Sequence, residues 1–239
     1  MATKKIGKNV GIFYLGHSAF KLISPHGKVV LIDPWVENPL LHTSIKDLGK
    51  VDLILITHGH GDHIGNALSI ARETQATIVG IHEISQYLVA KGHSKVIGMN
   101  KGGTLEAEGL KITMTHAVHS STISENGQMI PAGEAAGFII EFENGFRIYH
   151  AGDTAVFKDM EIIRDIYGPE LVILPIGDHY VMSSKEAAYA CKLLRPKFVI
   201  PMHYETFPIL TGTPQKFQHL VKDISDLEVM VLAPGEGVE

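Results

Sequence analysis

The chain has 239 residues, of which 45% are hydrophobic and 20% are charged, and its formal net charge is −5. The length suits one large domain or two small ones with a sizeable core. The acidic balance gives no electrostatic footprint for nucleic acid, and no apolar run approaches the ~20 residues that span a bilayer. The N-terminal residues lack a signal-peptide core, and the single cysteine, Cys191, excludes an intrachain disulfide or a multi-thiolate site. We therefore expect a cytoplasmic globular protein.

Three short apolar segments with strand character open the chain, at residues 10–15, 20–23 and 28–32. His17 lies in a tight turn after the first of them. Asp33 ends the third and precedes Pro34. A carboxylate at that place can shape the turn, or it can accept the spare N–H of a metal-bound histidine.

The next apolar run, Val51–Ile56, precedes the stretch Thr57-His58-Gly59-His60-Gly61-Asp62-His63. The run predicts a buried strand, and residues 64–73 have helical periodicity, so the stretch should be the turn between strand and helix. Its first two histidines alternate along an extended backbone and can point to one place, whereas its aspartate and last histidine begin the helix and can face a second place. These donors suit zinc, manganese, iron or nickel. The turn therefore predicts ligands for two neighbouring cations.

Further polar residues follow predicted strands in the middle of the chain. His116 and His119 come after a strand at residues 110–115, and Asp153 comes after the next hairpin. A carboxylate can bridge two cations with its two oxygens, whereas a histidine binds one. Residues 121–136 contain glycine, serine and proline without periodicity, and a loop of that length inside a domain is usually functional or disordered. We expect this loop to form a flap over the site.

The last part of the chain alternates helices, expected at residues 160–167, 183–194 and 214–221, with strands, expected at 171–174, 198–201 and 228–232. His179 and His203 each follow one of these strands. No linker interrupts the chain. Two successive blocks, about 1–100 and 104–239, each contain strands followed by strand–ligand–helix units, which suits a single domain over 1–239 made of two similar halves.

The motif His-x-His-x-Asp-His after an apolar strand resembles the signature of the metallo-β-lactamase-fold hydrolases. The resemblance extends over nearly the whole chain, because the following segments are similar to the UlaG-like, UPF0173-type branch of small metal-dependent hydrolases: Leu15-Gly16-His17-Ser18-Ala19-Phe20, Ile32-Asp33-Pro34, His150-Ala151-Gly152-Asp153-Thr154 and Pro175-Ile176-Gly177-Asp178-His179. The resemblance implies an α/β (α+β) fold, a four-layer αββα sandwich with the metals in the cleft between its two sheets.

The resemblance also implies the ligand set. One cation is assigned to His58, His60 and His119, the other to Asp62, His63 and His203, and Asp153 is assigned to both. Two divalent ions, with zinc expected first and manganese, nickel or iron as alternatives, would share a water and lower its pKa, and the bridging hydroxide would attack an ester carbon or phosphorus. Outside the ligands, Asp33 and His116 are expected to support the metal-bound imidazoles.

Catalytic roles are expected for Asp62, beside its role as a ligand, and for a histidine that gives a proton to the leaving group. His179 is the favoured donor, because its strand lies in the same half as Asp153 and His203, and His17 is the alternative.

The expected function is hydrolysis of a small-molecule ester, either a phosphodiester or a lactone. Alternatives are a non-catalytic metal-binding or sensor protein of the same fold and a nuclease-type phosphodiesterase, although the latter would need a basic groove that the composition does not provide. The expected partner is therefore a small-molecule substrate, without nucleic acid or membrane, and a homo-oligomer is left open.

Overall fold

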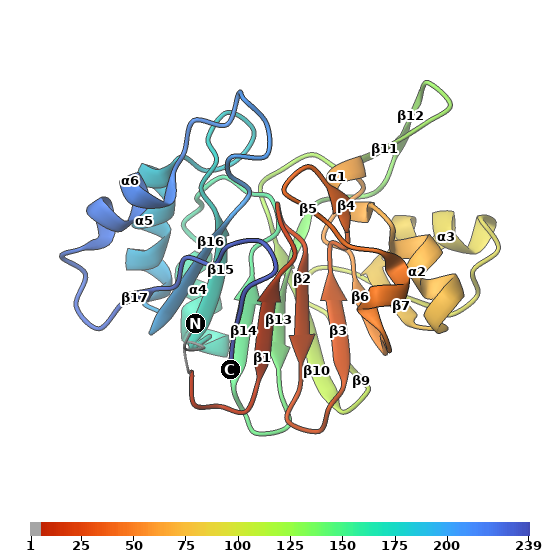
Figure 1. The fold of residues 1–239 in the computed structure, drawn as a ribbon, viewed down its shortest axis with the longest axis horizontal. Coiled ribbons are helices and arrows are strands. Elements are labelled where there is room, and N and C mark those ends of the chain that lie inside the picture. The colour runs from red at the N-terminus through yellow and green to blue at the C-terminus, as the bar shows by residue number, and fades with distance from the viewer. Residues whose placement is uncertain (1–5) are drawn as a thin grey trace.

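The computed structural model describes residues 6–239, which form two seven-stranded β-sheets packed face to face with helices on both outer faces (Figure 1). The first sheet has the order β18-β1-β2-β3-β6-β7-β8, with bounds Gly237–Val238, Gly11–Tyr14, Phe20–Ile23, Val29–Ile32, Leu53–Leu55, Thr77–Ile81 and Val96–Met99. The second has the order β17-β16-β15-β14-β13-β10-β9, with bounds Glu228–Val229, Phe198–Met202, Leu171–Pro175, Arg147–His150, Ala136–Glu141, Leu110–His116 and Thr104–Ala107.

The helices form the two outer layers. The helices α2 (Ala67–Thr74) and α3 (His82–Ala90) lie beside the first sheet, and α4 (Met160–Tyr167), α5 (Ser184–Leu194) and α6 (Pro214–Val221) lie beside the second (Figure 1). Smaller elements complete the chain, namely β4 (Glu37–Asn38), β5 (Leu41–His42), the 3-10 helix η1 (Ile45–Leu48), the short helix α1 (Gly61–Ile64), β11 (Thr122–Glu125) and β12 (Gln128–Pro131). The predicted four-layer αββα sandwich is thereby confirmed.

Strand direction gathers the chemistry at one edge of the sandwich. In the first sheet β1 and β3 are parallel, because both pair antiparallel with β2, and β6 continues parallel to β3. In the second sheet β10 is parallel to β14, because both pair antiparallel with β13, and β15 and β16 continue in that direction. The carboxyl ends of these strands therefore meet at one edge in each sheet, which is where open α/β sheets place their sites.

Apolar side chains fill the spaces between the layers. Phe20 and Ile32 of the first sheet and Phe138 of the second belong to one fully buried cluster between the sheets. A second cluster lies under α4–α6 and includes Cys191, whose pKa is raised to about 12 by burial. All of β15 is buried, as expected for a parallel strand covered on both faces. These two cores hold the strand ends rigidly.

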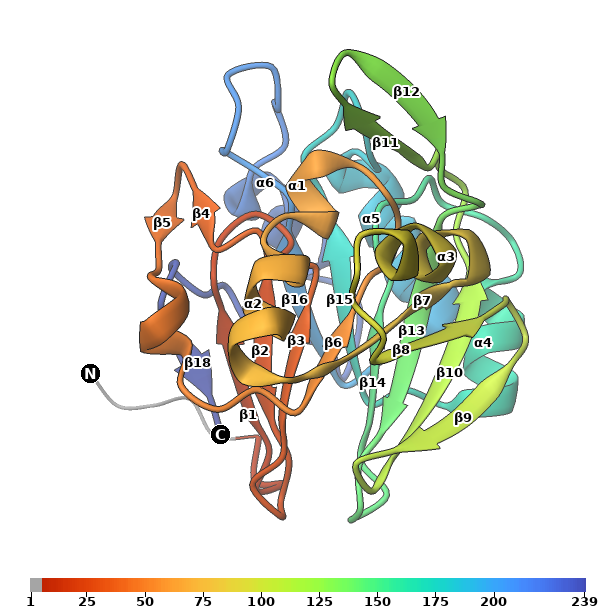
Figure 2. The same ribbon diagram turned by 90° about the vertical axis from the view of Figure 1, so that its right-hand side faces the viewer.

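Two local predictions differ from the structure. The helix expected over residues 64–73 is divided into α1 and α2 by Gly65, which has φ +41° and approaches the Trp35 backbone so closely that a Cβ would lie 2.6 Å from its Cα. The loop expected at residues 121–136 contains the antiparallel hairpin β11–β12, which projects at the end of the sandwich (Figure 2). Its turn is Asn126-Gly127, with φ +50° and +75°, and this dipeptide favours a two-residue hairpin turn.

Among residues 6–239, no helix combines the length and the apolar character that a membrane crossing needs.

Candidate metal centre

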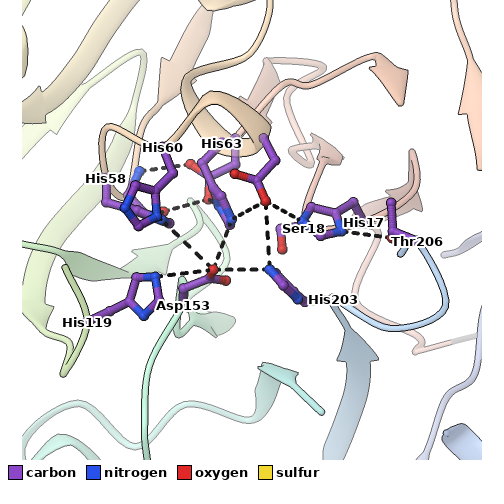
Figure 3. Close-up of polar contacts among 12 residues, drawn as sticks. His17, Ser18, His58, His60, His63, His119, Asp153, His203 and Thr206 are labelled. Atoms are coloured by element: carbon purple, nitrogen blue, oxygen red, sulfur yellow. Dashed lines mark hydrogen bonds and ion pairs between the residues drawn. The ribbon is translucent and has the colours of Figure 1, made fainter. Parts of the chain in front are cut away.

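The seven predicted ligands lie together at the shared edge of the sheets (Figure 3). They come from the segments after β6, β10, β14 and β16, and are His58, His60, Asp62, His63, His119, Asp153 and His203. Both halves contribute, so the centre forms only when the two sheets pack. Strand ends anchored in the core limit the freedom of each donor.

One oxygen of Asp153 is the centre of the cluster (Figure 3). Its Oδ2 lies 3.1 Å from Nε2 of His63 and 3.1 Å from Nε2 of His203. The same oxygen lies 3.7 Å from Nε2 of His119 and 3.9 Å from Nε2 of His58. Asp153 therefore faces donors of both predicted sets, as a bridging carboxylate must.

The first donor set consists of His58, His60 and His119, whose ligand atoms all lie within 4.8 Å of one another. The turn brings Nε2 of His58 to 3.0 Å from Nδ1 of His60. The other nitrogen of His60 lies 3.4 Å from the Ser120 hydroxyl. His60 thus turns its Nδ1 toward the centre and its Nε2 toward Ser120.

The second donor set consists of Asp62, His63 and His203. Their ligand atoms and one nitrogen of His17 all lie within 4.8 Å of one another. Asp62 Oδ2 lies 3.9 Å from Nε2 of His63 and 4.0 Å from Nε2 of His203. The first three were predicted as ligands of one cation, and the structure brings them together. His17 was not predicted in this set.

Asp33 supports two of the imidazoles from the side away from the centre. Its Oδ2 accepts a hydrogen bond from Nδ1 of His63 at 2.8 Å and another from the Thr57 hydroxyl at 2.6 Å. Because that hydroxyl proton is used, Thr57 Oγ1 accepts from Nδ1 of His58 at 3.0 Å. Asp33 therefore holds His63 directly and His58 through Thr57, with their Nε2 atoms toward the centre. The sequence indicated Asp33 but not Thr57.

The electrostatics of the centre favour neutral imidazoles in the first set and charged carboxylates. Burial lowers the pKa of His58 well below its ordinary value and also lowers the pKa of His60 and of His119. Burial would raise the pKa of Asp153, but His203 and His63 hold that pKa well below its ordinary value. Neutral imidazole and ionised carboxylate are the forms that bind cations.

The donor set fits divalent cations on a further observation. Among residues 6–239, Asp153 Oδ1 is buried without a hydrogen-bond partner, and buried His63 Nε2 faces Asp153 Oδ2 at 3.1 Å without hydrogen-bond geometry. Burial disfavours the charged form of His63, yet Asp153 and Asp33 raise its pKa well above the ordinary value when no cation is present. Uncompensated buried polar atoms are costly, and a cation in the place of the His63 proton would compensate them.

A cavity of about 340 Å3 opens onto the cluster and is lined by His60, Asp62, His119, Ser120, Asp153, Tyr180, His203 and Phe207. Two aromatic side chains, Tyr180 and Phe207, form its apolar walls. A larger hollow of about 570 Å3 lies between α5 and α6, but none of the predicted site residues lines it. We place the site in the smaller cavity because only there do donor atoms converge.

The structure does not bring His116 or His179 to the centre. His116 is exposed, and its Nδ1 lies 3.1 Å from Lys101 Nζ. His179 is also exposed and stacks edge-on against Tyr180 instead of lining the cavity. Asp178 and His179 both have positive φ, of +67° and +58°, and the residue that this turn delivers to the cavity is Tyr180.

We therefore expect His179→Ala to change kcat by less than about twofold, because an exposed side chain outside the cavity cannot give a proton to a leaving group. The measurement is steady-state hydrolysis of one substrate with a poor and one with a good leaving group. A selective loss on the poor leaving group would restore His179 as the proton donor.

The hairpin β11–β12 is fastened to the metal-binding turn at Gly59. The Gly59 N–H donates to the Ser121 hydroxyl at 3.1 Å, and that hydroxyl donates to the Ala132 carbonyl at 3.0 Å. A Cβ on Gly59 would lie 2.7 Å from the Ala132 Cβ and 3.0 Å from Ile123 Cγ1. Only glycine therefore allows the hairpin base and the turn to approach this closely.

Gly59→Ala should consequently displace the hairpin base or the turn, with a loss of about 1–3 kcal/mol in the free energy of unfolding and weaker binding at the His58–His60–His119 set. Gly61→Ala is the matched control, because no atom lies within 4 Å of a Cβ at Gly61 in the same turn. Thermal unfolding and cation titration of both variants test this, and equal behaviour of the two would contradict it.

Comparisons with known proteins identify the family of this chain. The family model described as Beta-lactamase superfamily domain matches residues 28–204. A UPF0173 metal-dependent hydrolase of Roseiflexus sp. (strain RS-1) is 51% identical over the full length of both chains. A UPF0173 metal-dependent hydrolase of Methanosarcina barkeri is 47% identical and covers 96% of this chain and 98% of its own.

Solved structures are similar as well. Igni18, a metallo hydrolase from the hyperthermophilic archaeon Ignicoccus hospitalis, is 43% identical, with a TM-score of 0.86 over 96% of this chain and 97% of its own. An isothiocyanate hydrolase from Delia radicum gut bacteria has a TM-score of 0.73 over 96% of this chain and 98% of its own, but at 19% identity it shares the fold alone. By the family model, the curated relatives and the fold, this chain belongs to the β-lactamase superfamily and, within it, to the UPF0173 metal-dependent hydrolases.

Proposed function

We propose that this hydrolase cleaves an ester bond of a small molecule, a phosphodiester or a lactone, with two divalent cations, zinc first, at the cluster around Asp153. The observation that supports this most directly is the position of Asp153 Oδ2 within 3.1–3.9 Å of imidazoles from both donor sets. A dinuclear centre needs such a shared anion, and the cavity gives a substrate access to it.

The cations would supply a nucleophile from water near neutral pH and offset the negative charge that develops on the substrate. The residues of the chain orient this chemistry. Asp33 and Thr57 fix the tautomers of His63 and His58, so that their Nε2 lone pairs face inward. Asp153 places a negative charge between the two donor sets, and Tyr180 and Phe207 line the cavity beside them.

The cavity favours a small substrate over a nucleic acid. Its volume of about 340 Å3 is near the lower end of the range for small-molecule sites. Its lining contains no lysine or arginine, whereas nucleic-acid channels use positive charge along the backbone. The relatives described above as metal-dependent hydrolases support the reaction class, and the choice of an ester substrate is our own.

The test is a substrate panel with the metal-saturated protein, comprising γ- and δ-lactones, bis(p-nitrophenyl) phosphate, p-nitrophenyl acetate, and single- and double-stranded DNA. We expect metal-dependent turnover of at least one small ester and no cleavage of DNA, with chelated protein as the blank. Cleavage of DNA in preference to the small esters would favour the nuclease alternative. Two bound cations without turnover of any ester would overturn the proposal in favour of a metal-binding protein.

A further inference from the structure

His17 lies behind the second donor set and not in the cavity. Its side chain is fully buried and is absent from the residues that line the cavity. Its ring packs against His203, with ring centroids 4.0 Å apart, and edge-on against Trp35 and Phe207. A proton on this imidazole cannot reach a substrate in the cavity directly. A role as proton donor, expected from the sequence, is therefore not available to His17.

Both nitrogens of His17 are engaged (Figure 3). Nε2 lies 2.9 Å from Asp62 Oδ2, and Nδ1 lies 2.8 Å from the Thr206 hydroxyl. An ionised carboxylate has no proton to donate, so Nε2–H of His17 donates to Asp62. Nδ1 of the neutral ring then accepts from the Thr206 hydroxyl at 2.8 Å, because the other acceptor of that hydroxyl, the Tyr204 carbonyl, lies farther away at 3.3 Å. The hydroxyl thereby selects the tautomer that can hold Asp62.

Asp62 depends on this bond for its orientation. Its side chain is 27% exposed, and within residues 6–239 His17 makes the only hydrogen bond to it. His17 also bonds the second half of the chain through its backbone, because the His203 N–H donates to the His17 carbonyl at 2.8 Å. One buried residue thus touches two of the three donors of the second set, one from each half.

We propose that His17 is a positioning residue that, with its tautomer fixed by Thr206, holds Asp62 in the orientation that binds the second cation. This inference rests on the dinuclear site of the proposed function and assigns to His17 a role at one of its two positions only. Residues that orient a metal ligand typically contribute 10–100-fold to metal affinity. The first set is supported by Asp33 through Thr57 and by Ser120; none of these residues is hydrogen-bonded to His17, so the first set should be independent of it.

The experiment titrates the metal-free full-length protein with Zn2+ and, for spectra, with Co2+. His17→Ala should lower the affinity for one of the two cations by about 10–100-fold and leave the affinity for the other unchanged. Thr206→Val should act in the same direction, Thr206→Ser should be neutral, and His17→Gln should restore affinity because its amide can donate to Asp62. In an Asp62→Ala background, His17→Ala should have no further effect on either cation.

The pattern of cation binding across these variants separates positioning from packing, and thermal unfolding of the metal-free variants checks that each of them is folded. Positioning is supported if His17→Gln binds both cations normally while His17→Ala binds one of them more weakly. Equal weakening of both cations, or an additive loss in the Asp62→Ala background, would overturn it in favour of a packing role. Loss of a nitrogen ligand from the Co2+ spectrum in His17→Gln would overturn it in favour of direct ligation. Wild-type protein that binds fewer than two cations would refute the dinuclear site itself, which is a distinct result.

Discussion

Replacing Asp153 with alanine should remove at least one of the two cations and lower kcat/KM by at least about 100-fold. A loss of about 100-fold is the largest that is typical for a residue that only orients a metal ligand, and Asp153 is expected to be a ligand itself. The reason is the position of its Oδ2 among Nε2 atoms from both donor sets, at 3.1 Å from His63 and His203 and at 3.7 Å from His119. Without this carboxylate, two dications would face one another with no anion between them. Metal content per chain and steady-state hydrolysis measure the two effects.

Asp153→Asn separates charge from shape, because the amide fills the same volume without the charge. We expect it to resemble Asp153→Ala in metal content. His116→Ala is the control, since His116 is an exposed histidine bonded to Lys101, and it should retain both cations and full activity. Two tightly held cations in Asp153→Ala, or full activity of the wild-type chain with one cation, would contradict the dinuclear assignment.

Gly177→Ala should produce the largest loss of stability among single glycine substitutions at the site. A Cβ at Gly177 would lie 2.0 Å from the His203 carbonyl oxygen, which is backbone and cannot rotate away. The end of β15 or of β16 must therefore move, and His203 moves with it. We expect a loss of about 3 kcal/mol in the free energy of unfolding and a fall in Tm of roughly 6–12 °C, together with weaker binding of the second cation.

Gly80→Ala is the control for this substitution. Gly80 lies in β7, and a Cβ there would meet the nearest atom at 3.5 Å, an ordinary contact. Calorimetry of the metal-free proteins separates the loss of stability from the loss of a cation. A Gly177→Ala variant with the Tm and cation affinity of the wild type would show that the strand ends can separate at no cost.

The parts of the site that could be predicted are those in which local sequence fixes geometry. The turn from His58 to His63 follows a buried strand, so alternation along the backbone and the start of α1 determine where its donors point. Asp33 could be inferred for the same reason, because it ends a strand beside β6. The two-block order of strands and helices, together with the family resemblance, likewise predicted the αββα architecture.

The parts that could not be predicted depend on contacts across the fold. Thr206 lies 189 residues from His17 in sequence, and nothing local marks it as a hydrogen-bond partner. At the end of β15, consecutive residues with positive φ turn Tyr180 into the cavity in place of His179, and such backbone conformations are uncommon outside glycine. The hairpin β11–β12 is different, because its Asn126-Gly127 turn signal is present in the sequence.

The strand β18 determines when the first sheet can be completed during synthesis. It pairs with β1 through Ile12↔Val238 and Phe13↔Gly237, and the Ile6 N–H bonds to the Glu239 carbonyl at 2.6 Å. During synthesis on the ribosome, this edge strand of the first sheet is translated only after every strand of the second sheet. Until then β1 exposes an unpaired edge, which is a template for wrong pairing.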